Sequence, residues 1–151
     1  MSMTETLTDL NKRLARLEDL EAIRQLFIDY GHHLDHCDFD SYGRLFAADG
    51  ELLLGPMGRA RGPAAITELM RARLGGSQGN SYHLIANPII DLQGDRATSV
   101  VTWAAITRGP KGEPALTLYG YHKDQLIREG GGWKFLRREG HIALPSKFTQ
   151  P

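Results

Sequence analysis

From residue 81 to residue 92 the chain reads Ser-Tyr-His-Leu-Ile-Ala-Asn-Pro-Ile-Ile-Asp-Leu, and this stretch decides how the fold is interpreted. It follows a two-residue period and is rich in β-branched residues, which is typical of a β-strand. Three further segments repeat the pattern, at residues 97–107, 115–128 and 133–144. Because glycine-containing turns separate these segments, consecutive strands are expected to form antiparallel hairpins.

Upstream of these strands the apolar residues follow helical spacing instead. We expect a long helix at residues 8–34, a short helix that is capped by Asp38 and extends to Phe46, and a third helix opened by Pro63. A short apolar strand is expected at residues 51–54. Three helices followed by long consecutive strands predict an α+β domain, in which a strongly curved antiparallel sheet wraps the helices around a cone-shaped cavity.

Length and composition narrow the class of protein. The 151 residues suit a single domain with short tails at residues 1–8 and 145–151. The 18 basic and 18 acidic residues balance, so we expect no nucleic-acid or anionic membrane partner. Cys37 is the single cysteine, and the chain has neither a leader-like start nor an apolar run of membrane-spanning length. A reduced, cytoplasmic location is therefore expected.

Tyr30 and Asp35 lie at the C-terminal end of the expected long helix. Helical spacing puts Tyr30 in the apolar stripe and Asp35 on its flank. Because the free carbonyl groups at a helix C-terminus disfavour a negative charge, Asp35 needs a cationic or hydrogen-bonding partner. The alternative is that Tyr30 is an ordinary core residue and that Asp35 only closes the helix.

His83 lies among apolar residues of the first long strand. A carboxylate beside a buried imidazole fixes its tautomer and stabilises the cation that forms when the ring accepts a proton, and Asp35 is a candidate for that carboxylate. The alternative is a core histidine whose hydrogen bonds are satisfied by the backbone.

Motifs spread over nearly the whole chain resemble the SnoaL-like branch of the nuclear transport factor 2 superfamily. They are Asp-x-x-Ala-Ile-x-x-Leu at residues 19–26, Tyr30, Asp35, residues 38–46, Gly62-Pro63 with Ile66, His83, Asn87-Pro88, Gly94-Asp95 and residues 132–135. Within this branch the chain is similar to bile acid 7α-dehydratase, scytalone dehydratase and hexachlorocyclohexane dehydrochlorinase. The resemblance implies a cystatin-like cone with an Asp35–His83 dyad at its mouth. It also implies that Tyr30 assists the departure of an oxygen leaving group.

The same resemblance implies a pocket arginine at Arg138, for which a solvated strand position is the alternative. Residues 100–105 contain no acid or base where some relatives carry one, so we expect an apolar pocket with simpler chemistry. The side chains expected to wall this pocket are Phe27, Phe46, Leu52, Leu54, Met70, Val101 and Trp103. Such a wall suits a small hydrophobic, polycyclic or aromatic substrate.

Other ionisable residues support fewer roles. His32, His33 and His36 crowd one helix end, but they project in different directions and no further ligand completes a set, so no metal is expected. The pattern leaves open whether His122 or His141 faces the pocket.

Two functions from different classes remain. The favoured interpretation is a cofactor-independent lyase of the dehydratase type, or an isomerase, with His83 as base, Asp35 as its orienting carboxylate and Tyr30 as donor. The alternative is a non-catalytic ligand-binding or partner domain, similar to the small subunits of ring-hydroxylating dioxygenases. We also expect a homo-oligomer, a dimer or trimer, because the outer face of the sheet carries uncovered apolar residues and the tail at residues 143–151 is long enough to cross to a neighbour.

Overall fold

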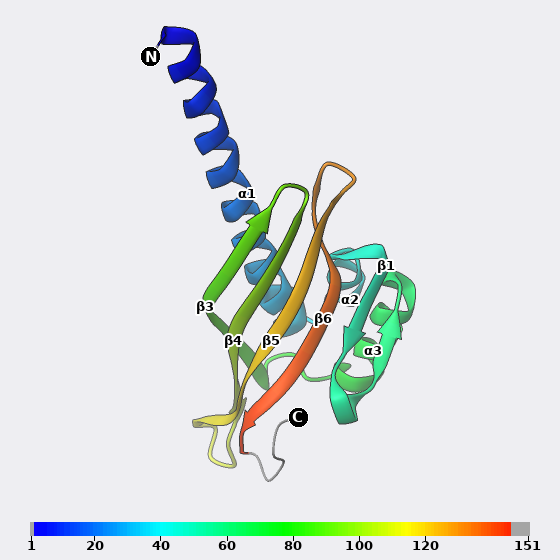
Figure 1. Ribbon diagram of the computed structural model, residues 1–151. Coiled ribbons are helices and arrows are strands. Elements are labelled where there is room, and N and C mark those ends of the chain that lie inside the picture. The colour runs from blue at the N-terminus through cyan, green and yellow to red at the C-terminus, as the bar shows by residue number, and fades with distance from the viewer. Residues whose placement is uncertain (1, 146–151) are drawn as a thin grey trace.

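The computed structural model describes residues 2–145, and its helices lie against one face of a strongly curved sheet (Figure 1). The helices are α1 (Met3–Asp35), α2 (Phe39–Gly43) and α3 (Pro63–Leu74), with a single 3₁₀ turn η1 (Gly55–Met57). The strands are β1 (Phe46–Leu53), β2 (Arg59–Arg61), β3 (Ser81–Gln93), β4 (Arg96–Arg108), β5 (Pro114–Glu129) and β6 (Gly132–Leu144). The predicted α+β class is confirmed.

The six strands form one sheet in the order β2-β1-β6-β5-β4-β3. Neighbours are antiparallel, as expected, except that β1 and β6 are parallel. This pairing explains why the short helix ends at Gly43 and does not continue to Phe46: Phe46 lies opposite Phe135, and the Phe135 amide donates to the Leu45 carbonyl at 2.9 Å. Long-range pairing therefore overrides the local helical spacing. The sequence does not predict β2, because its three residues are too few to show a strand pattern.

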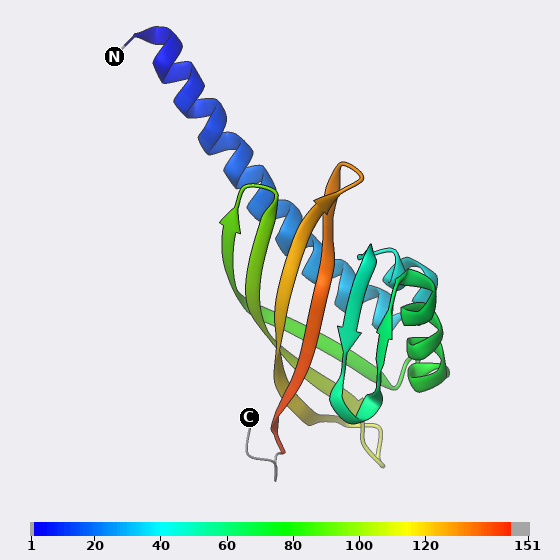
Figure 2. The same cartoon turned by 45° about the vertical axis from the view of Figure 1, so that its right-hand side comes forward.

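Bulges in the long strands produce the curvature. In β3 the register shifts between Ala86 and Ile89, where Asn87 adopts a positive φ of 52°. On β4 and β5 the shift falls between Ala105 and Ile106. These bends carry the first residues of β3 across the end of α1, which Figure 2 shows from the side.

The core lies between the sheet and the C-terminal half of α1. This half buries Ile23, Leu26, Phe27, Tyr30 and Leu34. The helix begins five residues earlier than expected, with a capping box between Ser2 and Glu5, and its N-terminal half extends beyond the sheet into solvent (Figures 1 and 2). The apolar stripe of the long helix therefore packs on the core only in its second half.

The outer face of the sheet carries the exposed apolar residues that motivated the expectation of an oligomer, among them Tyr82, Leu84, Ile89 and Val100. Whether another chain covers them stays a prediction. The part of the tail expected to cross to a neighbour lies, from residue 146 on, outside the described residues. Within residues 2–145 no helix is both long and apolar enough to cross a membrane.

Candidate active site

Asp35 and His83 are in direct contact. The last residue of α1 accepts two hydrogen bonds on Asp35 Oδ1, from His83 Nδ1 at 2.8 Å and from the His83 backbone amide at 2.9 Å. The two side chains are only 14% and 18% exposed. Because a carboxylate only accepts, the ring proton lies on Nδ1 and Nε2 is the proton-accepting nitrogen. His83 is thus the partner that the position of Asp35 at a helix C-terminus requires.

Gly31 allows this contact by bringing β3 close to α1. A Cβ at Gly31 would lie 3.1 Å from Ile85 Cγ1 and 3.9 Å from His83 Cβ. An alanine at this position would require the Ile85 side chain to shift by a few tenths of an ångström, so glycine suits this close approach.

A cavity of about 180 Å³ opens beside the dyad, and both His83 and Tyr30 line it. Asp35 lies behind His83, outside the lining. The rest of the wall is largely apolar and includes Leu34, Leu54, Met57, Met70, Leu74 and Trp103. An apolar chamber with two convergent polar groups is typical of a small-molecule site.

Tyr30 is buried at the inner end of this cavity. Burial raises the pKa of its phenol, and the nearby Arg138 guanidinium opposes this shift without reversing it. The Tyr30 ring lies 4.2 Å from the guanidinium carbon and packs at 4.8 Å against the ring of Tyr42. Tyr30 therefore remains a protonated phenol held in one place, which is a hydrogen-bond donor.

Arg138 lies deeper in the core than expected. Its side chain is fully buried, and it donates from Nε and Nη2 to the two oxygens of Asp124 at 2.7 and 2.8 Å. Burial lowers the pKa of Arg138, but the charge and hydrogen bonds of Asp124 outweigh this and raise it. Ser99 adds a third hydrogen bond to Asp124. Arg138 thus neither lines the cavity nor faces solvent, and its guanidinium lies against the ring of Tyr30, which does line the cavity.

His122 is the cavity residue that the sequence left open. It is 4% exposed and lines the cavity, with its ring between Tyr30 at 5.3 Å and Trp103 at 5.7 Å. Burial, reinforced by the charge of Arg138, holds the pKa of His122 well below its usual value, so the ring is neutral. Its Nδ1 and the indole nitrogen of Trp103 are buried without a hydrogen-bond partner. Such atoms are available to a ligand.

The expected wall residues divide into two groups. Leu54, Met70 and Trp103 line the cavity, whereas Phe27, Phe46, Leu52 and Val101 are buried in the core outside its lining. Val101 and Trp103 point to the same face of β4, but Val101 is fully buried in the hydrophobic core and only Trp103 of the two reaches the cavity. Strand alternation predicts the face of a side chain and not its distance from the opening of the cone.

The remaining histidines lie outside the cavity lining. His141 stacks on Tyr121 at 4.8 Å, and the rings of His32 and His36 pack at 4.2 Å. In residues 2–145 no three metal-ligating side chains are grouped closely enough to hold an ion.

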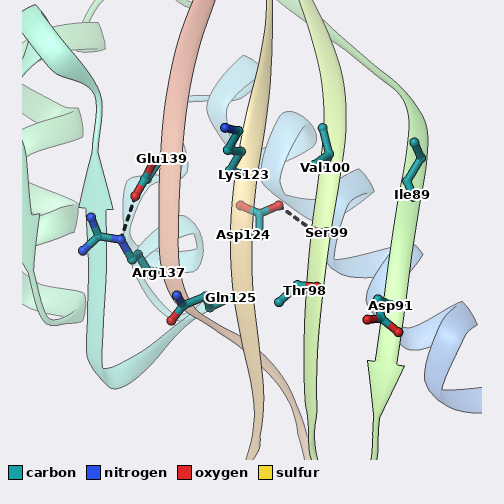
Figure 3. A pocket seen from close by; sticks show the side chains of 10 residues that line it. All are labelled: Ile89, Asp91, Thr98, Ser99, Val100, Lys123, Asp124, Gln125, Arg137 and Glu139. Carbon is teal, nitrogen blue, oxygen red and sulfur yellow. Dashed lines mark hydrogen bonds and ion pairs between the residues drawn. The ribbon is translucent and has the colours of Figure 1, made fainter. Parts of the chain in front are cut away.

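A larger hollow of about 370 Å³ lies on the opposite face of the sheet (Figure 3). Its rim includes Lys123, Gln125 and the ion pair between Arg137 and Glu139 at 2.8 Å. The carboxylate of Asp124, which borders it, is already bound to Ser99 and Arg138. No histidine lines this hollow, whereas His83 and His122 line the inner cavity.

The family of the chain follows from its sequence and fold together. Residues 15–139 match the model of the SnoaL-like domain, and the chain therefore belongs to this family of the NTF2-like superfamily. An uncharacterised protein of Mycobacterium tuberculosis is 24% identical over 126 residues, which cover 83% of this chain and 86% of the relative.

Solved structures show the same cystatin-like fold. An NTF2-like protein of Novosphingobium aromaticivorans is 28% identical, with a TM-score of 0.82, over 93% of this chain and 92% of that one. A proposed scytalone dehydratase of the same species is also 28% identical, with a TM-score of 0.75, over 90% and 91% of the two chains. A hexachlorocyclohexane dehydrochlorinase at 18% identity and the β subunit of a proposed aromatic-ring-hydroxylating dioxygenase at 17% share the fold alone, with TM-scores of 0.76 and 0.71.

Proposed function

We propose that this protein is a cofactor-independent lyase of the dehydratase type, or an isomerase, that acts on a small hydrophobic substrate. The observation that carries the proposal is the hydrogen bond between Asp35 and His83 at the wall of an apolar cavity that also contains Tyr30. The similarity to a proposed scytalone dehydratase supports an elimination.

His83 Nε2 removes a proton from a carbon next to a carbonyl or similar activating group, and Asp35 stabilises the resulting imidazolium. The neutral phenol of Tyr30 donates a hydrogen bond to the oxygen on which negative charge develops. In an elimination the C–H and C–O bonds break, a C=C bond forms, and the proton from carbon and the departing hydroxide together give water. In an isomerisation the same proton returns to another carbon.

The size of the cavity limits the substrate. Drug-sized ligands occupy pockets of about 300–1,000 Å³, whereas this cavity measures about 180 Å³. A substrate with one or two rings therefore fits better than a complete steroid. The unpartnered nitrogen of His122 and the indole nitrogen of Trp103 offer it a polar contact within an apolar wall.

The proposal is tested by incubating the protein with hydroxylated one-ring and two-ring carbonyl compounds and following loss of water by mass spectrometry. Incubation in deuterated water detects proton abstraction even where elimination is slow. Asp35→Asn should abolish most of both signals, because it removes the charge while keeping the shape of the side chain. Full exchange and turnover by this variant on an identified substrate would contradict the role of the dyad.

A non-catalytic ligand-binding or partner domain predicts the opposite pattern. Asp35→Asn would then leave ligand affinity unchanged, no compound would be turned over, and a wall change such as Trp103→Ala would have the largest effect by weakening affinity.

The cytoplasmic location expected from the single Cys37 also stays a prediction, which cell fractionation can test.

A further inference from the structure

The N-terminal half of α1 projects from the domain (Figures 1 and 2). It carries a row of exposed apolar side chains. The side chains in this row are 48–81% exposed, although all five are large and apolar. They are Met3, Leu7, Leu10, Leu14 and Leu17. We call this row the α1 seam.

The spacing of the α1 seam is that of a coiled coil. The intervals between its members alternate between four and three residues, so Leu7 and Leu14 occupy a positions and Met3, Leu10 and Leu17 occupy d positions of a heptad. A helix that packs on a globular core needs a wider apolar stripe than a and d alone. The segment at residues 3–14 also precedes the match to the family, which begins at residue 15.

The seam faces away from the domain that carries it. Asp19 attaches α1 to the sheet by accepting hydrogen bonds from Arg128 at 2.7 Å and from the indole of Trp133 at 3.0 Å. Asp19 follows Leu10 by nine residues, which at about 100° per residue places the two on opposite sides of the helix. A second helix lying on the seam would therefore not collide with this sheet.

The sequence shows where the apolar stripe changes sides. Leu17, Leu20, Ile23 and Leu26 follow one another at three consecutive intervals of three residues. Each such interval turns the stripe by about −60°, so three of them turn it by about half a circle. The stripe therefore passes from the seam to the core-facing side over these residues, and α1 contains two separate packing surfaces.

We propose that the α1 seam pairs in parallel with the same seam of a second copy of this chain, as a short two-stranded coiled coil. Arg13 occupies a g position and Glu18 the e position of the following heptad. In a parallel pair these positions face each other across the interface, so Arg13 of each copy meets Glu18 of the other. The two-fold axis produces this match twice. An antiparallel pair brings g opposite g and e opposite e, and the match is lost.

A seam of five residues is short, but the helix does not have to form for pairing. Its C-terminal half is fixed on the core, so the cost of helix nucleation is already met. Pairing therefore requires only that two preformed helices align, and dissociation constants on the order of micromolar are expected.

The test compares two double variants of the whole chain by sedimentation velocity from about 1 to 100 μM. Leu7→Lys with Leu14→Lys places charge in the seam, and Thr8→Lys with Ala15→Lys places the same charge at neighbouring positions outside it. The seam variant should raise the dissociation constant at least about a hundredfold, since two buried leucines are lost from each copy. The control should change it less than about threefold. Both pairs of positions are exposed, so circular dichroism should show folded protein.

Charge and orientation are tested separately. Arg13→Glu should weaken association, and adding Glu18→Arg should restore it. In a Cys37→Ser background, Leu10→Cys should form an intermolecular disulfide under mild oxidation, because equivalent d positions lie opposite each other in a parallel pair. A monomeric wild type over the whole range, or an equal effect of the seam and control variants, overturns the proposal. Seam-dependent association without the Leu10→Cys disulfide overturns the parallel arrangement.

Discussion

Replacing Arg138 with methionine should destabilise the fold by about 3–5 kcal/mol, because it leaves the carboxylate of Asp124 buried without its cation. Both side chains are fully buried, and the pair is joined by hydrogen bonds of 2.7 and 2.8 Å. Hydrogen bonds to charged groups contribute about 1.5–3 kcal/mol each. The remaining bond from Ser99 offsets part of the loss, which keeps the expected cost below the sum of the two bonds.

Equilibrium unfolding in urea measures this cost, with Arg137→Met as the matched control. Arg137 also forms two ion pairs, with Glu51 at 3.0 Å and Glu139 at 2.8 Å, but its side chain is 37% exposed. Exposed pairs contribute up to about 1 kcal/mol each, so the loss of both in the control should cost at most about 2 kcal/mol. The two arginines are neighbours in sequence, and only their burial separates them.

A double variant shows whether the buried charge is the cause. Combining Arg138→Met with Asp124→Leu should recover most of the lost stability, because no charge from this pair is then left in the core. An Arg138→Met cost no larger than that of Arg137→Met would refute the reasoning.

Three other outcomes are expected. His83→Ala should lower turnover by about a hundredfold or more, and Tyr30→Phe should lower turnover yet leave measurable exchange of substrate hydrogen in deuterated water; equal loss of exchange in both would contradict these roles. Burial holds the pKa of His122 below that of a histidine in the unfolded chain. As the pH falls below about 6, the free energy of unfolding in urea should therefore decrease by up to about 1.4 kcal/mol more per pH unit for the wild type than for His122→Phe. Parallel curves for the two proteins would speak against a neutral buried ring. Gly43→Ala should destabilise the fold by about 1–3 kcal/mol in thermal unfolding, because the new Cβ would lie 2.1 Å from the hydroxyl oxygen of Thr67. A Cβ at Gly132 meets nothing within 4 Å, so Gly132→Ala should be nearly neutral.

The contact between Asp35 and His83 could be anticipated, because its causes are local or follow from the resemblance to relatives. A carboxylate in the last turn of a helix needs a donor, and the start of β3 supplies one. The parallel pairing of β1 with β6 has no local signal, since it joins Phe46 to Phe135 across most of the chain. Local spacing therefore extended the short helix to Phe46 and gave no indication of the parallel neighbour.

Other features of the site could be predicted from the sequence only once the register between neighbouring strands was known. Asp124 and Arg138 lie at similar distances on either side of the turn between β5 and β6, and a one-residue register shift between Gln125 and Leu126 brings them into direct pairing. Two opposite charges at facing positions on one hairpin indicate an ion pair. His122 shares its face of β5 with Asp124 and with the buried Leu126, so the two-residue period predicts that it points inward. Val101 is buried in the core outside the cavity lining, and a strand pattern does not predict which inward-facing residues other elements cover.

The hydrogen bond from the His83 amide to Asp35 also affects how the protein resists aggregation. Since β3 is the last strand of the sheet, one side of its backbone has no neighbouring strand, and such edges can recruit strands from other molecules. Asp35 accepts a hydrogen bond from the His83 amide, which would otherwise be free on this edge. Asp35→Asn keeps an acceptor oxygen, whereas Asp35→Ala removes it, so turbidity on prolonged incubation should rise for the alanine variant and not for the asparagine variant. Equal turbidity in the two would show that the side chain orients the imidazole without protecting the edge.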